Sequence, residues 1–183
     1  MTRYIAFLRA INVGGHARIP MHDLRDAFGA AGCLSVRTYI QSGNVIFESS
    51  SRNPEALLRK VRGKLRGVLG SEPEIMLRSF EEMQNLVRGA PFKSSEAEKG
   101  IKLYVVFLLR MPRSRPLFPL ASSKEALKAI DMSRREVFVV SRRKANGFFG
   151  FPNEFVEKVL GVPAASRNWS TVLKMVQLAQ WEL

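Results

Sequence analysis

Two polar motifs that follow apolar runs have the residue types best suited to hold an anion. Asn12-Val-Gly-Gly15 ends the run that begins at Tyr4, and Ser42-Gly43-Asn44 separates two shorter runs. Glycine lets backbone N–H groups approach a ligand closely, and clusters of such groups bind anions. Neither motif is a GxGxxG fingerprint or a P-loop, which ends in Gly-Lys-Ser/Thr. A tight turn with positive φ would explain both motifs without a ligand, so the two roles stay open.

Arg167-Asn168 stands where the last predicted helix begins. A helix N-terminus beside an arginine favours anion binding, whereas Asn168 can also act as an N-cap. The neighbouring Trp169 is interpreted as a packing residue rather than as a platform for a ligand. The candidate ligand-binding residues are therefore Asn12, Gly14, Gly15, Ser42, Asn44, Arg167 and Asn168.

No arrangement of residues predicts catalysis or metal binding. Cys33 follows a glycine at a predicted helix end with no histidine placed to activate it, so a buried structural role is expected. His22 and Asp23 are neighbours on a helix, a spacing that is not expected to make an oriented acid–base pair. One cysteine and two histidines give no zinc spacing. The sequence therefore assigns no catalytic residue, no metal and no cofactor.

Positive charge is the unusual bulk property of this chain. The net charge is +13, and residues 101–150 alone hold 11 Lys/Arg against three Asp/Glu. Such an excess attracts nucleic acid, anionic surfaces or acidic ligands, although a solvated charged surface explains the same residues. The RNP1 pattern of RNA-recognition sheets is missing from Ser42 to Ser49. A nucleic-acid module would therefore contact phosphates through Arg59, Arg62, Arg66, Arg142, Arg143 and Lys144.

The elements that must position these residues follow from periodicity and turn signals. Tyr4–Ile11 is predicted to be a strand with both faces apolar, Pro20 opens a helix, and Asn53-Pro54 caps another. Strands flank the turn at 42–44, and 74–78 is a fourth strand. Later elements are expected as a strand at 101–109, a helix at 123–130, a strand at 136–140, a helix at 152–160, a strand at 162–166 and a helix at 169–181.

The order strand, helix, strand, strand, helix, strand is that of the split βαβ, or ferredoxin-like, unit, and the order is predicted twice. The predicted fold is α+β, with two tandem ferredoxin-like halves and a C-terminal helix. The expected boundaries are 1–79 for the first half, 80–100 for a helix and connection, and 101–183 for the second half with the last helix. One cysteine and the lack of a signal-peptide or membrane-span pattern favour a cytoplasmic protein.

Three separated stretches resemble the bacterial domain-of-unknown-function family 1697. They are Leu8–Gly15, Thr38–Phe47 and Arg167–Val172, and the resemblance runs along the whole chain. It implies a compact α+β protein of two ferredoxin-like halves, and it implies no settled activity. This chain departs from the family at Ala10, where a glycine is usual, and at Gly150–Pro152, where an Arg-Ser-Lys stretch commonly precedes a helix. The basic and hydroxyl groups of that stretch are absent here.

Three hypotheses of function follow from the sequence. The preferred one is binding of a small anionic or phosphate-bearing molecule at the candidate residues. The alternative is a nucleic-acid-associated basic module, and the third is a structural or interaction protein without a ligand. No membrane contact is expected, and no residue pattern specifies an oligomeric state. Enzymatic activity is neither assigned nor excluded.

Overall fold

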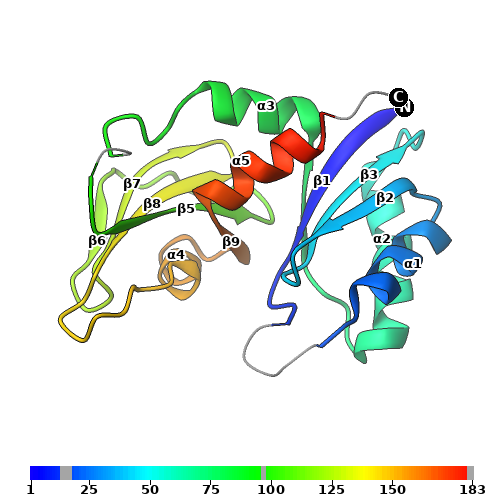
Figure 1. The fold of residues 1–183 in the computed structure, drawn as a ribbon, viewed down its shortest axis with the longest axis horizontal. Helices are drawn as coiled ribbons and strands as arrows, with labels where there is room; N and C mark the ends of the chain where they lie inside the picture. Colours follow the sequence, from blue (N-terminus) through cyan, green and yellow to red (C-terminus); the bar gives the residue numbers. More distant parts are fainter. Residues whose placement is uncertain (13–17, 96–97, 181–183) are drawn as a thin grey trace. The chain divides into compact units, whose positions relative to one another are not determined.

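The computed structural model describes residues 1–12, 18–95 and 98–180, and the chain forms two compact units (Figure 1). The first unit comprises Met1–Asn85 with Met175–Leu183, and the second comprises Leu86–Lys174. The chain passes from one unit to the other within α3 (Phe80–Arg88) and returns within α5 (Trp169–Leu178). Across the described ranges, no helix combines the length and the apolar character needed to cross a membrane.

The first unit is a four-stranded antiparallel sheet with two helices on one face (Figure 1). The strand order is β2-β3-β1-β4, and Phe7 of β1 pairs with Asn44 of β3. The element order confirms the prediction for this part of the chain. Its elements are β1 (Thr2–Leu8), α1 (Met21–Ala30), β2 (Leu34–Tyr39), β3 (Asn44–Ser49), α2 (Pro54–Leu69) and β4 (Ile75–Ser79).

Local sequence signals account for these elements. Asn53 caps α2, because its side-chain oxygen accepts a hydrogen bond from the Ala56 amide at 3.0 Å, and proline occupies the first helical position. Ser79 and Glu82 form a capping box at the start of α3. The buried stripe of α2 packs with α1 against the sheet, and burial stabilises each such side chain by about 1.5–3 kcal/mol. That stripe consists of Leu57, Leu58, Val61 and Leu65.

A buried ion pair ties the central strands of the first unit together. The guanidinium of Arg3 donates two hydrogen bonds to one carboxylate oxygen of Glu48, at 2.7 and 3.2 Å, and a third to the carbonyl of Ala179 at 2.7 Å. Arg3 and Glu48 are direct partners across β1 and β3. The hydrogen bond from Arg3 holds the pKa of Glu48 below its ordinary value, against the opposing effect of burial.

This pair predicts a specific loss of stability in acid. Because the folded-state pKa of Glu48 is lowered, its contribution is present above the unfolded pKa of about 4.3 and is lost as the pH falls through the folded value. Arg3→Gln should reduce this pH dependence, which urea unfolding near neutral pH and at about pH 3 would measure. Arg9→Gln is the control, because the Arg9–Glu74 pair is longer, 3.6 Å, and exposed. If the free energy of unfolding changed equally between the two pH values in wild type and in Arg3→Gln, the assignment of the pH dependence to this pair would be contradicted.

The second unit contains a five-stranded antiparallel sheet, and α4 packs on one face of it. The strand order is β6-β7-β8-β5-β9, so the buried strand β5 lies between β8 and β9. Tyr104, Val106 and Leu108 point from β5 into the core that includes Val156 of α4. The elements are β5 (Ile101–Leu108), β6 (Leu120–Ser122), β7 (Leu127–Ser133), β8 (Glu136–Arg142), α4 (Asn153–Leu160) and β9 (Ala164–Asn168).

The helix predicted at 123–130 is wrong, because this stretch is a turn followed by β7. Ser122 pairs with Leu127 across a four-residue loop that Ala126 closes, with φ 52 and a hydrogen bond from its amide to the carbonyl of Ser123. Positive φ at alanine breaks a helix and suits a hairpin loop. The α+β class with two antiparallel sheets is confirmed, whereas the tandem ferredoxin-like arrangement is not confirmed.

A polar network fixes α4 against β9. Asn153 donates to Glu157 and to the carbonyl of Ala164, and it accepts from the hydroxyl of Ser166, with distances of 2.9–3.1 Å. Glu157 also accepts from the amide of Ala164 at 2.7 Å. The network satisfies polar groups of the short helix and sets the position of its C-terminal end, where Gly161 adopts φ 63.

Candidate functional site

The side chain of Asn12 closes the loop that follows β1. Its amide nitrogen donates to the carbonyl of Ile19 at 3.1 Å, and its oxygen accepts from the amide of Ile19 at 2.9 Å. Asn12 has φ 56, a left-handed conformation that asparagine tolerates. Both polar ends of the Asn12 side chain are therefore bonded to the backbone of Ile19. Gly14 and Gly15, the two glycines of the predicted motif, lie outside the described residues.

The Ser42-Gly43-Asn44 turn packs directly against the end of β1. The carbonyl of Gly43 accepts from the amide of Leu8 at 2.8 Å, which confirms that these strand ends share one edge of the sheet. Asn44 is fully buried, and its amide nitrogen donates to the carbonyl of Tyr39 at 3.1 Å and to the hydroxyl of Ser42 at 2.9 Å. This geometry gives Ser42 and Asn44 a structural role in the turn.

Backbone strain gathers at the same edge. Ala10 has φ 55 and Ile40 has φ 50. These left-handed conformations are unfavourable for residues that carry a Cβ, and most unfavourable for β-branched residues such as isoleucine. Ala10 is the position at which the family resemblance expects glycine, the residue that adopts positive φ most readily. Strain of this kind costs about 1–3 kcal/mol per residue and persists only where the surroundings enforce it.

Arg167 and Asn168 end β9, the edge strand of the second sheet. The guanidinium of Arg167 donates to the carbonyl of Ser166 at 2.9 Å, and burial lowers the pKa of Arg167 to about 10. Asn168 is exposed, and Trp169 is buried with its ring 5.3 Å from that of Phe92. Arg167 and Asn168 belong to the second unit, and the other candidates belong to the first. Their convergence on one pocket stays a prediction.

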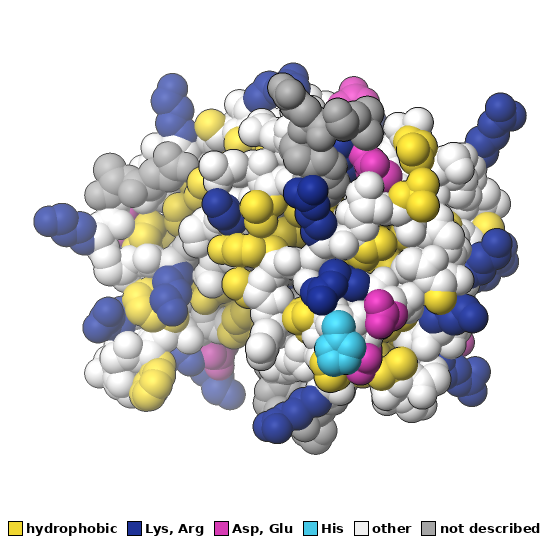
Figure 2. Space-filling view, turned by 45° about the vertical axis from the view of Figure 1, so that its right-hand side comes forward, with side chains coloured by type: hydrophobic (Ala, Val, Ile, Leu, Met, Phe, Trp, Pro, Cys, Tyr) yellow, Lys and Arg dark blue, Asp and Glu magenta, His cyan; other side chains and the backbone are white. Residues whose placement is uncertain are grey.

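The basic residues proposed for phosphate contacts differ in their surroundings. On α2, Arg59 and Arg66 are exposed and Arg62 is half-buried, and Arg66 makes a 3.7 Å ion pair with exposed Glu72. Figure 2 shows Lys and Arg side chains spread over the visible face rather than gathered in one patch. This arrangement agrees with the solvated-surface interpretation of the charge.

The basic turn after β8 is largely neutralised by acidic partners. Arg142 is ion-paired with Glu98, and Lys144 donates to Glu125 at 2.6 Å, which holds the pKa of Glu125 below its ordinary value. Arg143 instead lies over the ring of Phe149, with its guanidinium carbon 5.3 Å from the ring centre. Two of the three cations in this turn are thus committed to intramolecular pairs.

The residues with possible catalytic chemistry do not form a site. Cys33 is buried, and burial raises the pKa of its thiol to about 11, so it is not a nucleophile at neutral pH. The side chains of His22 and Asp23 do meet, with 3.0 Å between imidazole and carboxylate, contrary to the expectation from their spacing. Both are solvent-exposed on α1. Within the described parts of the chain, no group of three or more His, Cys, Asp or Glu could hold a metal ion.

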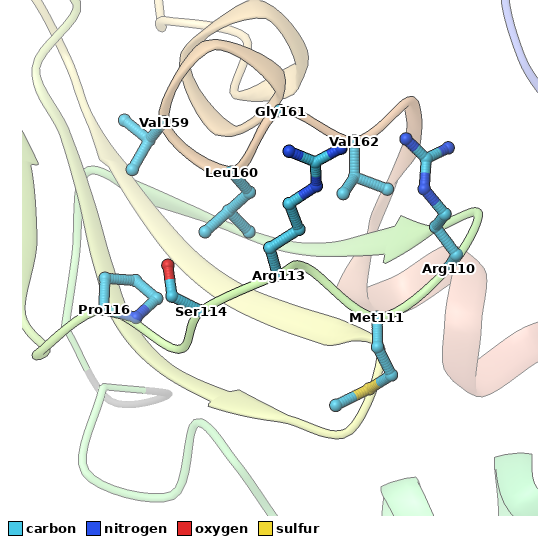
Figure 3. Close-up of a pocket in the computed structure, with 9 residues that line it drawn as sticks. All are labelled: Arg110, Met111, Arg113, Ser114, Pro116, Val159, Leu160, Gly161 and Val162. Carbon is cyan, nitrogen blue, oxygen red and sulfur yellow. The ribbon is translucent and has the colours of Figure 1, made fainter.

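The second unit contains a cavity that is lined by two arginines. It lies where the connection after β5 passes the C-terminal end of α4. Its volume is about 260 Å³. Figure 3 shows the guanidinium groups of Arg110 and Arg113 extended toward the α4–β9 turn, while the Met111 side chain points away. The lining residues are Arg110, Met111, Arg113, Ser114, Pro116, Val159, Leu160, Gly161 and Val162.

The charge of this cavity is not balanced within its lining. No carboxylate lines it, and neither Arg110 nor Arg113 has a hydrogen-bond or ion-pair partner among the described residues. The neighbouring Arg115 differs, because it bonds Asp131 at 3.1 Å and the carbonyl of Met132 at 2.6 Å. The sequence analysis missed the cavity. Its only signal in the sequence is Arg110, Arg113 and Ser114 within a proline-containing connection, Arg110-Met-Pro-Arg-Ser-Arg-Pro116.

Comparison with known proteins agrees with the family resemblance. No curated protein matches the chain. Among solved structures, the chain is similar to the conserved bacterial protein SP0830 from Streptococcus pneumoniae, with a TM-score of 0.67 and 21% identity over 98% of this chain and 99% of that one. This likeness bears on the fold alone. The model of the family described as Protein of unknown function (DUF1697) matches residues 1–138, so the expected likeness at Arg167–Val172 lies beyond the match. Because that match covers most of the sequence, the chain belongs to this family.

Proposed function

We propose that the protein binds a small anionic molecule, and that Arg110 and Arg113 supply the charge that holds it. The observation that carries the proposal is the cavity of about 260 Å³ that Arg110 and Arg113 both line, without an acidic partner among the described residues. The ligand class is that expected from the sequence, whereas the site differs from the predicted residues.

The lining chemistry indicates what the ligand would contain. A guanidinium presents a planar set of donors that matches a carboxylate or a phosphate in a bidentate manner. Ser114 adds a hydroxyl, and Pro116, Leu160 and Val162 form an apolar wall. Pockets that combine an apolar wall with a few placed polar groups are typical of small-molecule sites. The fitting ligand therefore has one anionic group and a small apolar part.

The competing role for the two arginines is structural. Cations near a helix C-terminus interact favourably with its free carbonyl groups, and the cavity includes Leu160 and Gly161 at the end of α4. In that case, replacing the arginines would lower stability in the absence of any ligand. Anion binding instead predicts that stability without ligand changes little and that stabilisation by ligand is lost.

Thermal unfolding with inorganic phosphate, small carboxylates and phosphate monoesters tests the proposal. A ligand at 100 times its Kd would stabilise the wild type by about 2.7 kcal/mol. Arg110→Gln with Arg113→Gln should abolish this shift. The matched control is Lys128→Gln with Arg134→Gln, which removes two exposed charges of the same unit outside the cavity lining. Equal shifts in both double variants would overturn the proposed site.

The residues predicted from the sequence provide a second arm of the experiment. If Arg167→Gln removes the ligand-dependent shift while the Arg110/Arg113 double variant keeps it, the helix start at Arg167 and Asn168 is the site instead. If no anion raises the melting temperature of the wild type, the third hypothesis, a structural or interaction protein, replaces both.

A further inference from the structure

Two phenylalanine rings and two cations are held by β5 and the chain that follows β8 in the second unit. The chain turns back after β8, and Arg143 forms an antiparallel bridge with Phe149. The Lys102 ammonium of β5 lies 4.6 Å from the centre of the Phe149 ring, and the Arg143 guanidinium lies 5.3 Å from it. Phe151 follows, with its ring edge-on to Tyr104 at 5.8 Å. We call Lys102, Arg143, Phe149 and Phe151 the aromatic–basic patch.

Backbone hydrogen bonds hold the hairpin that carries Arg143 and Phe149, and the Phe151 side chain remains accessible. The hairpin beneath it is closed by hydrogen bonds from the Lys144 amide to the Phe148 carbonyl at 2.8 Å and from the Gly147 amide to the Lys144 carbonyl at 2.9 Å. Tyr104, which supports Phe151, is buried, whereas Phe151 itself is 56% exposed. An exposed ring that packs edge-on against a buried neighbour leaves surface free for a partner, and an aromatic side chain has few rotatable bonds to order on binding.

We infer that the aromatic–basic patch binds single-stranded nucleic acid, with a base stacked on Phe151 and phosphates held by Lys102 and Arg143. A single strand presents flat bases beside anionic phosphates, and the patch presents one exposed ring, Phe151, beside the cations Lys102 and Arg143 that lie over the half-buried ring of Phe149. Base stacking on aromatic side chains next to a cationic track is the usual mode of sequence-tolerant single-strand binding. The inference rests on this surface and is independent of the cavity lined by Arg110.

Single strands fit the patch better than duplexes or membranes do. A duplex hides the faces of its bases, so Phe151 could not stack on them. Peripheral binding to anionic lipid generally uses an amphipathic helix, and the patch is built from β5 and a hairpin. Arg142 and Lys144 form ion pairs with Glu98 and Glu125. Lys102 and Arg143 have no acidic partner in the described part of the chain, so these two residues would contact the phosphates.

Fluorescence anisotropy with a labelled oligothymidine of about 12 nucleotides tests the inference. Binding should weaken with salt, with a slope of about −0.7 per phosphate contact in a plot of log K against log salt concentration. Phe151→Ala should lower affinity about tenfold with the slope unchanged, and Phe151→Trp should restore it. Lys102→Gln with Arg143→Gln should reduce the slope by about 1.4.

Matched controls separate stacking from general attraction to charge. Leu117→Ala removes another exposed apolar side chain of the same unit, and Lys128→Gln with Arg134→Gln removes two other exposed charges. Neither control should change affinity as the patch variants do. Equal binding of a duplex of the same length, or no effect of Phe151→Ala on a correctly folded protein, would overturn the inference. Binding to anionic phosphatidylserine vesicles without binding to the oligonucleotide would also overturn it.

Discussion

Gly150→Ala is expected to destabilise the second unit by about 3 kcal/mol or more. A Cβ at position 150 would overlap the carbonyl oxygen of Glu125 and would lie 3.2 Å from the side chain of Leu127. A backbone oxygen cannot rotate away as the end of a flexible side chain can. Relief would require moving the turn before β7, and the carbonyl of Gly150 also accepts a buried hydrogen bond from Ser141 at 2.9 Å.

Urea unfolding followed by tryptophan fluorescence measures this effect in the right unit. Trp169 is buried against Phe92 in the second unit, so a Trp181→Phe background gives a signal from Trp169 alone. Gly147→Ala is the matched control, because Gly147 has φ 82 but nothing lies within 4 Å of its added Cβ. It should cost only about 1 kcal/mol, from the backbone conformation. Equal costs at the two positions would contradict the steric argument.

Gly150 also lies in the stretch Gly150–Pro152, where the resemblance expects Arg-Ser-Lys before a helix. In this chain, the position has room only for glycine, because an added Cβ would meet the backbone of Glu125. A larger residue at 150 would therefore require a different course of the 123–126 turn.

Sequence patterns predicted the elements whose signals are local. The cap at Asn53 is confirmed, and the strand predicted at Tyr4–Ile11 is confirmed as a buried strand that ends at Leu8, because residues 9–12 form a turn. The helix at 123–130 failed because the turn there uses Ala126 at positive φ, where glycine or asparagine would have signalled a hairpin. Short apolar runs do not distinguish a strand from a helix, and here pairing of β7 with β8 decides.

The sites were harder to predict than the elements. Asn12 and Asn44 are predicted as ligand-binding residues. In the structure, their amides hydrogen-bond to nearby groups of the same chain, and ligand binding by them stays a prediction. The Arg110–Arg113 cavity depends on the connection after β5 meeting the end of α4, a contact between segments about 50 residues apart that no spacing rule reports. Phe151 was counted only as part of a family departure, because exposure of a ring is a property of the fold.

Gly43→Ala is expected to destabilise the first unit by about 2–4 kcal/mol. Gly43 has φ 69, which costs an alanine about 1–2 kcal/mol, and its added Cβ would lie 2.9 Å from the Cβ of Leu8 and 3.2 Å from that of Ile11. Both neighbours are buried, and the amide of Leu8 is bonded to the carbonyl of Gly43. The turn therefore cannot move outward without breaking its contact with β1.

Gly29→Ala in the same unit is the matched control for Gly43→Ala. Gly29 lies within α1, and nothing is within 4 Å of its added Cβ, so alanine should stabilise the helix by up to about 1 kcal/mol. Opposite signs at the two positions, measured by urea unfolding, would establish that Ser42-Gly43-Asn44 is required for packing. If Gly43→Ala were instead neutral for stability and removed anion-dependent stabilisation, the turn would be a ligand site after all. That result would contradict the assignment of anion binding to Arg110 and Arg113.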